Sequence, residues 1–170
     1  MDILYREADK SDAAQLLCHL KCVGSETDNL SFDGSTFSIS EEKEAKFIER
    51  FKNSKNDIML VALDGDKVVG NAIVERNKVL RYKHRAEISI TVLKDYWGGG
   101  IGSRLMQMMV DFAEKTGVEI LYLEARADNQ RALSLYEKYG FEPIGTYENF
   151  FKIGDSYFDA VLMNKKIKKI

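Results

Sequence analysis

Four glycines fall within five residues, at positions 98–100 and 102, and a helical pattern follows them without a gap. Glycine costs about 0.5–1 kcal/mol relative to alanine inside a regular element, so such a cluster is unfavourable unless the backbone itself has a function. The first N–H groups of a helix have no internal partner, and the helix dipole adds positive potential there. Because no Cβ atom stands in the way, a large anion could touch these groups. The stretch therefore predicts an anion site.

Two common phosphate-binding patterns do not fit this stretch. A P-loop needs a lysine after its last glycine, and Ser103 stands there, where it could instead add a hydroxyl to an anion site. The dinucleotide pattern G-x-G-x-x-G fails from Gly98 and from Gly100, and the loop does not follow the first strand. A turn that only lets a strand pack tightly on a helix stays open as the alternative.

The chain of 170 residues has the size and composition of one globular domain, which we place at residues 1–170. Apolar periodicity and turn residues predict strands over residues 3–8, 85–92, 118–125, 141–154 and 156–164, and a hairpin over residues 57–76 around the turn DGDK. The same signals predict helices over residues 11–23, 38–55, 103–117 and 129–140. This order is typical of an α/β protein with a mixed sheet and helices on both faces.

Capping patterns mark the ends of two of these helices. Ser38 and Glu41 fit a capping box at the start of the second helix. Asn129 is the expected N-cap of the last helix, and Gly140 its expected C-cap. The expected buried face of the second helix consists of Ala45, Phe47, Ile48 and Phe51.

Composition argues against several classes of protein. A net charge of −2 leaves no basic excess to hold a nucleic acid. No stretch approaches the ~18 apolar residues of a membrane span, and the N-terminus has no apolar signal region, so we expect a cytoplasmic protein without a membrane partner. Cys18 and Cys22 are too few for a zinc site, so we expect two reduced, partly buried thiols and no metal.

Two motifs resemble those of the GNAT superfamily of N-acetyltransferases. The stretch ISITVLKDYWGGGIGSRLM is similar to the acetyl-CoA motif of that family, and LEARADNQRALSLYEKYGFEPIG is similar to its second signature, N-x-x-A-x-x-[LF]-Y-x-x-x-GF. The resemblance covers nearly the whole chain and is weakest between residues 24 and 40. It implies a GNAT-like α/β fold, with a mixed, mostly antiparallel sheet of about seven strands and four helices on both faces. One departure is Trp97, which stands where the family usually has Gln or Arg.

The resemblance also implies a cofactor, acetyl-CoA, and the residues that bind it. The strand over residues 85–92 would splay from the next strand, and the pantetheine arm would lie in the gap like an added strand, on the backbone groups of Ile90, Thr91 and Val92. Asn129 would bond the cofactor near its thioester, in addition to or instead of capping its helix. The pyrophosphate would rest on the amides of Gly98, Gly99, Gly100, Ile101, Gly102 and Ser103.

Two further residues are candidates for the chemistry that the resemblance implies. Glu87 corresponds to a position that serves some GNAT enzymes as a general base, and its alternative role is that of an exposed strand residue. Tyr136 corresponds to the motif tyrosine that protonates the leaving thiolate, and its alternative role is that of a core aromatic residue. A backbone N–H near Val92 would meet the oxyanion.

The expected acceptor is an amine. We expect a small primary amine such as a polyamine, followed by a protein or peptide amine, attacking directly in a ternary complex. Acidic and aromatic residues in the two regions that flank the acceptor would suit a cation. A non-catalytic acyl-CoA-binding regulator of the same fold is the alternative from another class, and a homodimer is the expected assembly.

Overall fold

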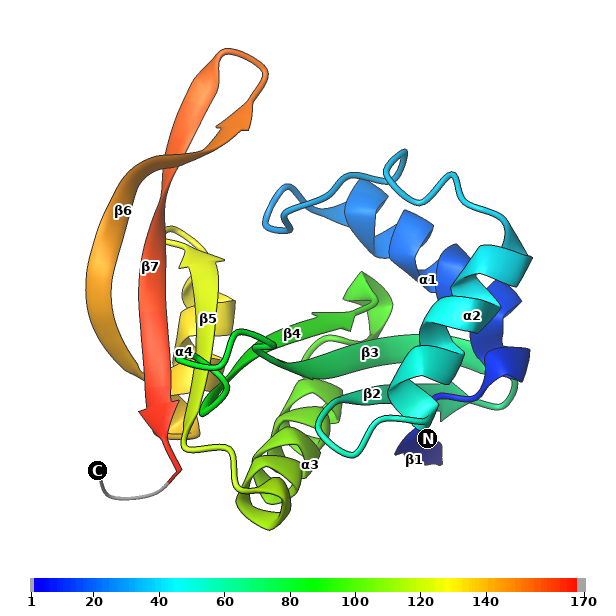
Figure 1. The fold of residues 1–170 in the computed structure, drawn as a ribbon. Helices are drawn as coiled ribbons and strands as arrows, with labels where there is room; N and C mark the ends of the chain where they lie inside the picture. Colours follow the sequence, from blue (N-terminus) through cyan, green and yellow to red (C-terminus); the bar gives the residue numbers. More distant parts are fainter. Residues whose placement is uncertain (1, 168–170) are drawn as a thin grey trace.

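A computed structural model of the chain, which describes residues 2–167, contains a seven-stranded sheet in the order β1-β2-β3-β4-β5-β7-β6 (Figure 1). Every neighbouring pair is antiparallel except β4 and β5, which are parallel. The mostly antiparallel mixed sheet confirms the predicted fold class. The strands are β1 (Ile3–Glu7), β2 (Ile58–Asp64), β3 (Lys67–Arg76), β4 (Arg85–Val92), β5 (Ile120–Arg126), β6 (Glu142–Ile153) and β7 (Ser156–Lys166).

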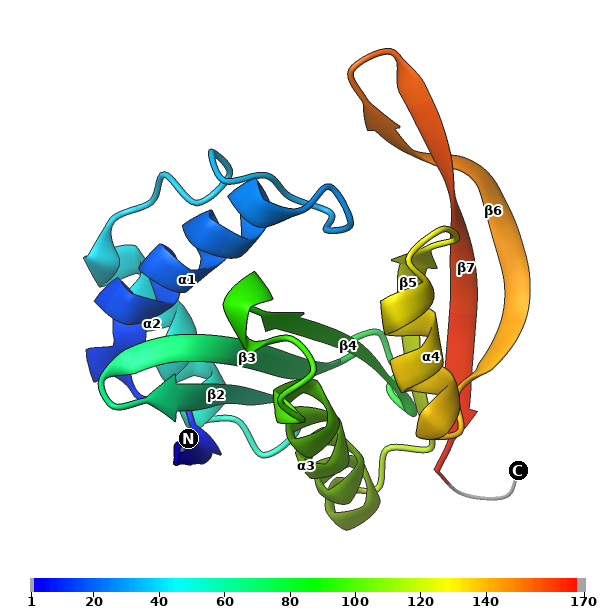
Figure 2. The ribbon, with the colours of Figure 1, turned by 180° about the vertical axis from the view of Figure 1, so that it is seen from behind.

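Four helices cover this sheet from both sides, as predicted. They are α1 (Ala13–Glu26), α2 (Glu41–Lys52), α3 (Ile101–Thr116) and α4 (Gln130–Lys138). Helices α1 and α2 pack on one face of the first strands, and α3 packs on the other (Figures 1 and 2). Each face has its own cluster of buried apolar side chains. Within residues 2–167, none of the helices combines the length and the apolarity needed to cross a bilayer.

The sheet is split between β4 and β5. The two strands pair only from Arg85 to Glu87 on β4, opposite Ile120 to Tyr122 on β5. Beyond that point β4 still pairs with β3 as far as Val92, but it diverges from β5, as Figure 1 shows. This bears out the splayed strand that the resemblance implied, and it leaves one border of β4 open in the middle of the sheet.

The start of α2 differs from the prediction. Its N-cap is Ser40, whose hydroxyl accepts a hydrogen bond from the N–H of Lys43 at 3.3 Å. The predicted cap, Ser38, donates instead to the carbonyl of Ser35, so the capping box with Glu41 does not form. The helix begins later because the loop before it forms its own turns. The hydroxyl of Ser38 bonds within that loop and is therefore not available to cap the helix.

The buried face of α2 is also rotated from the predicted one. Ile48 and Phe51 are buried as predicted, and Ala45 is half-buried, but the ring of Phe47 stays 39% exposed. A carboxylate takes part in the face instead, because Glu44 is only 3% exposed. Periodicity alone could not predict this, since a charged residue reads as a solvent position.

The cysteines were predicted to be partly buried, and this was wrong. Cys18 and Cys22 are both exposed free thiols on α1. The face of α1 that meets the sheet carries His19 and apolar residues such as Leu16 and Val23, so the cysteines fall on the other side. The helix also runs on to Glu26, three residues into the predicted loop.

Candidate active site

The glycine cluster forms a tight turn directly in front of α3. Gly98 and Gly100 have φ angles of 81° and 82°, in the left-handed region that side chains with a Cβ rarely adopt. Gly100 is the N-cap of α3 and has no side chain to offer the first turn. The two glycines are therefore required by the backbone path itself, which turns the chain from the end of β4 into the helix.

Five of the six N–H groups of residues 98–103 donate to no acceptor within the described residues. In the described part of the chain, the amides of residue 98 and of residues 100–103 donate to no protein group, and only Gly99 bonds back, to the carbonyl of Tyr96 at 3.4 Å. The first helical bond runs from Arg104 to Gly100. Five N–H groups at the positive end of a sixteen-residue helix thus remain available to an anion.

The surroundings of the turn hold it against its neighbours. A Cβ on Gly102 would lie 3.3 Å from Leu135 on α4, so this glycine permits the close contact of α3 and α4. The hydroxyl of Tyr139 donates to the carbonyl of Ser103 at 2.7 Å and joins the same two helices. The turn therefore combines tight packing with free amides, which supports both predicted roles of the glycines, as an anion site and as a packing turn.

The side chain of Trp97 connects the glycine turn to the end of β4. Its indole N–H donates to the carbonyl of Val92 at 2.8 Å, and the guanidinium of Arg131 lies 4.6 Å from the ring centre. The side chain that departs from the family pattern thus acts as a brace between the strand end and the glycine turn.

The open border of β4 can be assigned residue by residue. The N–H of Leu93 donates to Val69 on β3, and opposite residues in an antiparallel pair alternate between bonded and non-bonded. Thr91 therefore turns its main-chain groups to β3, while Ile90 and Val92 turn theirs to the gap beside β5. Of the three residues predicted to bind a pantetheine arm through the backbone, Ile90 and Val92 thus direct main-chain groups into the gap, and Thr91 does not. Thr91 uses its hydroxyl to contact Nε2 of His19, at 2.8 Å.

One cavity joins all of these features. It has a volume of about 960 Å³ and runs from the glycine turn, along the open border of β4, to a chamber beneath the loop between α1 and α2. It is lined at one end by Gly98, Gly100, Gly102 and Ser103, in the middle by Ile90, Asn129 and Tyr136, and at the other end by Phe32, Phe37, Glu44 and Phe47.

Tyr136 lies in the wall of this cavity. Its side chain is 8% exposed, and its ring packs at 5.9 Å from that of Phe141. Burial raises the pKa of Tyr136 to about 12, so the phenol keeps its proton at neutral pH. The hydroxyl has no hydrogen-bond partner among the described residues, which leaves the proton available to a group in the cavity.

Glu87 lies on β4 on the side of α1 and α2. Loss of hydration raises the pKa of Glu87, and the nearby carboxylates of Glu124 and Glu75 raise it further. Glu75 stands directly opposite on β3, and Glu124 lines the same cavity from β5. The side chain of Glu87 is still exposed to solvent. Glu87 is therefore a solvent-accessible carboxylate that binds a proton more readily than an ordinary glutamate.

Asn129 is the N-cap of α4, as predicted. Its Oδ1 accepts a hydrogen bond from the N–H of Ala132 at 3.3 Å. The amide also lines the cavity, so its Nδ2 group remains available on that side. Gly140 follows the end of α4 in the left-handed conformation, one position beyond the C-cap, Tyr139.

The loop over residues 27–40, between α1 and α2, is tied to both sides of the split. On one side, the carboxylate of Glu26, the last residue of α1, accepts a hydrogen bond from the N–H of Lys94, just after β4. On the other, the guanidinium of Arg126, at the end of β5, donates to the carbonyl of Asp28 at 3.1 Å. Arg126 is 7% exposed and forms two further hydrogen bonds with Asp128. The start of this loop is therefore held to both sides of the split, and further residues of the loop, such as Phe32 and Phe37, line the cavity.

Arg126, His19 and Glu44 were missed by the sequence analysis. Each is a polar residue buried by tertiary contacts with segments far along the chain, and no local pattern marks such a position.

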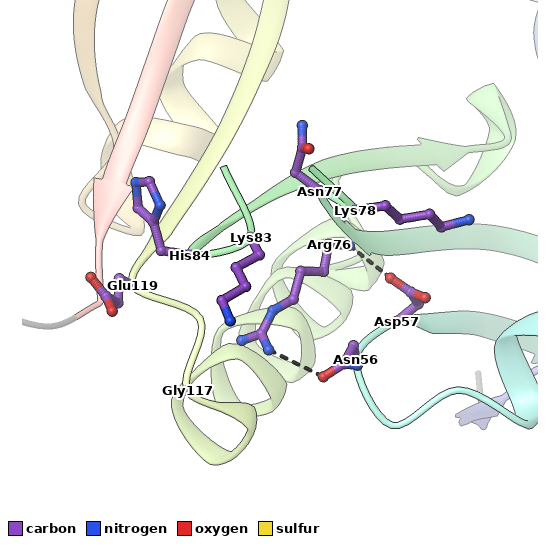
Figure 3. A pocket seen from close by; sticks show the side chains of 9 residues that line it. All are labelled: Asn56, Asp57, Arg76, Asn77, Lys78, Lys83, His84, Gly117 and Glu119. Carbon is purple, nitrogen blue, oxygen red and sulfur yellow. Dashed lines mark hydrogen bonds between the residues drawn. The ribbon is translucent and has the colours of Figure 1, made fainter. Parts of the chain in front are cut away.

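A second, polar pocket of about 560 Å³ lies at the other end of β4, away from the glycine turn (Figure 3). None of the predicted site residues lines it. Arg76 bonds to Asn56 and to the carbonyl of Thr116 there. The pocket is lined by Asn56, Asp57, Arg76, Asn77, Lys78, Lys83, His84, Gly117 and Glu119.

Residues 26–141 match the model of the acetyltransferase (GNAT) family. An acetyltransferase of the GNAT family from Streptococcus pneumoniae, known from its crystal structure, superposes with a TM-score of 0.94 at 33% identity, over 98% of this chain and 100% of that one.

Two curated relatives have more specific names. The [ribosomal protein bS18]-alanine N-acetyltransferase of Escherichia coli K12 is 39% identical over 75 residues, which are 44% of this chain and only about half (51%) of that protein. The L-amino acid N-acetyltransferase AaaT of the same strain is 30% identical over 131 residues, 76% of this chain and 80% of AaaT.

Proposed function

Because the chain belongs to the acetyltransferase (GNAT) family, we propose that it transfers an acetyl group from acetyl-CoA to a primary amine by direct attack in a ternary complex. One observation carries the proposal: the free amides at the start of α3 and the open border of β4 line one continuous cavity with Tyr136. When bound, the cofactor would supply an acetyl group already activated as a thioester.

The residues present fit coenzyme A at three points. Five free N–H groups suit a pyrophosphate, and the left-handed turn leaves them without Cβ atoms in front. The outward main-chain groups of Ile90 and the N–H of Val92 suit the amides of a pantetheine arm, which would complete the sheet, while the carbonyl of Val92 already accepts from Trp97. The free side of Asn129 would bind the same arm near its end.

The chain's own groups provide for the two proton transfers. Glu87, with its raised pKa, would take a proton from the ammonium of the acceptor, directly or through water. Tyr136, still protonated at neutral pH, would give a proton to the departing thiolate. The N–H of Val92 or of a neighbouring residue, at the open border, would stabilise negative charge on the acetyl oxygen.

The decisive experiment is release of free thiol from acetyl-CoA with a panel of primary amines. Thiol release that depends on the amine supports the enzyme. Binding of acetyl-CoA without thiol release from any amine would favour the non-catalytic regulator instead. A thermal-shift comparison with ATP and NAD separates both from a nucleotide-binding protein, because only the true ligand stabilises by RT ln(1 + [L]/Kd).

The cytoplasmic location and the homodimer stay predictions. Light scattering on the purified protein, with and without acetyl-CoA, measures the second directly.

A further inference from the structure

We propose that the acceptor is a short linear diamine, whose second ammonium group sits on Glu44 at the acceptor end of the cavity while the first is acetylated. This inference rests on the proposed function and names the substrate class for the same site. It does not concern the cofactor end.

Glu44 is the first reason. The residue is only 3% exposed and lines the cavity, and its carboxyl has no hydrogen-bond or ion-pair partner among residues 2–167. Burial raises the pKa of Glu44, and no charge or hydrogen bond opposes this effect. A buried carboxyl without a partner is costly, and a bound cation would remove that cost. The other acidic side chains of α2 reach solvent, so Glu44 alone is in this position.

The walls around Glu44 suit the methylene chain of such a ligand. Phe32 and Phe37 pack edge to face at 4.7 Å, and with Phe47 they surround the same end of the cavity. Aromatic faces attract an ammonium group and also bury alkyl carbons. Toward the split, Glu87 and Glu124 provide a second acidic region for the amine that reacts. The cavity is therefore acidic at two places, with apolar walls between them.

The charges that line the cavity argue against an amino acid as acceptor. An α-carboxylate needs a cationic partner. In the described residues, the only basic side chains on the cavity wall are Arg131 and Lys138, and both belong to α4. Arg131 lies over Trp97 and Lys138 near Tyr139, beside the glycine turn, where they suit the phosphates instead. The charged side chains at the acceptor end are therefore all carboxylates.

The size of the cavity argues for a small ligand. Its volume of about 960 Å³ is near the upper limit for a single small-molecule site, and it must hold both the pantetheine arm and the acceptor. Phe32 and Phe37, on the loop over residues 27–40, line the acceptor end and take up part of the space there, so a small ligand fits better than a peptide chain.

The test compares cadaverine with pentylamine, which share a five-carbon chain and differ by one ammonium group. We expect kcat/KM for cadaverine to exceed that for pentylamine by about 10- to 100-fold, as for a charged hydrogen bond. In Glu44→Gln this ratio should fall close to one. The control is Glu49→Gln, on the exposed side of the same helix, which should keep the ratio. Because a ratio is measured, a lower yield of folded protein does not distort it.

Each outcome bears on the inference. Equal use of the two amines by the wild type, or a preference that survives in Glu44→Gln, would overturn it while leaving the acetyltransferase assignment intact. Faster turnover of L-methionine, or of a short peptide with a free N-terminus, would overturn it in the same way. If acetyl-CoA binds but no amine releases thiol, the proposed function itself fails, and the inference fails with it.

Discussion

Acidification should destabilise this protein through one buried histidine. His19 is 2% exposed on α1, with Nε2 at 2.8 Å from the hydroxyl of Thr91 and with Nδ1 buried without a partner. Burial lowers the pKa of His19 from 6.5 to about 4, Lys67 acts in the same direction, and the backbone of Val68 partly opposes both. The folded protein therefore excludes a proton that the unfolded chain accepts.

The sign and the size of the effect follow from this difference. Between pH 6.5 and about 4 the unfolded state binds more protons, so stability is complete above pH 6.5 and falls as the pH drops toward 4. Each pKa unit corresponds to about 1.4 kcal/mol, so the loss should total about 3 kcal/mol. Below pH 4 this contribution should stop changing, because both states are then protonated.

Urea unfolding of the wild type and of His19→Gln, from pH 7 to pH 4 at constant ionic strength, measures the effect. Carboxylates titrate in both proteins and cancel in the difference. The glutamine variant should start less stable, because it loses the contact with Thr91 in its native form, and it should then lose about 3 kcal/mol less on acidification. Parallel loss of stability in the two proteins would refute the reasoning. An NMR titration of the His19 ring gives an independent check, since the ring should not titrate above pH 5.

Three further predictions concern the site. Tyr136→Phe should lower kcat by about 10²- to 10⁴-fold with little change in the affinity for acetyl-CoA, and turnover at the wild-type rate would exclude Tyr136 as the acid. Glu87→Gln should lower kcat/KM and remove the acid limb of the pH profile of kcat/KM. In the wild type this limb should lie above the ordinary glutamate range, because the pKa of Glu87 is raised. If the limb is unchanged in the variant, another group is the base. Gly100→Ala and Gly117→Ala place a Cβ at φ 82° and 72°, at opposite ends of α3, and each should cost about 1–2 kcal/mol of stability. Only Gly100→Ala should lose the thermal shift with acetyl-CoA, so an equal loss in both would place the cofactor elsewhere.

The parts that the sequence predicted well are those fixed by local chemistry. Glycines that precede a helix without a gap predict uncrowded, free amides at its start, and five such amides between residues 98 and 103 donate to no protein group in the described part of the chain. The turn between β2 and β3, and Asn129 at the start of α4, follow from residue types that favour those conformations. The split between β4 and β5 came from the resemblance and not from periodicity, because a strand that is open on one border has the same alternation as one that is paired.

The acceptor end could not be predicted in the same way. Glu44 reads as a solvent-facing residue of an amphipathic helix, and only the packing of α2 beneath its loop buries it. Arg126 follows β5 without a motif, and its role appears when Asp28, almost one hundred residues earlier, lies beside it. The offset of two residues in the cap of α2 has the same origin, because Ser38 and Ser40 are equivalent in type and only the path of the loop distinguishes them.

The open border of β4 has a consequence for the protein without ligand. A row of unpaired N–H and C=O groups is what allows edge strands of different molecules to join, and soluble proteins normally protect their outer strands against this. Here the row lies inside the sheet, between β3 and the diverging β5, and the start of the loop after α1 is held across it through Glu26 and Asp28. A foreign strand would have to displace that loop before it could pair, so the chain can keep a strand permanently ready for a ligand without exposing it to self-association.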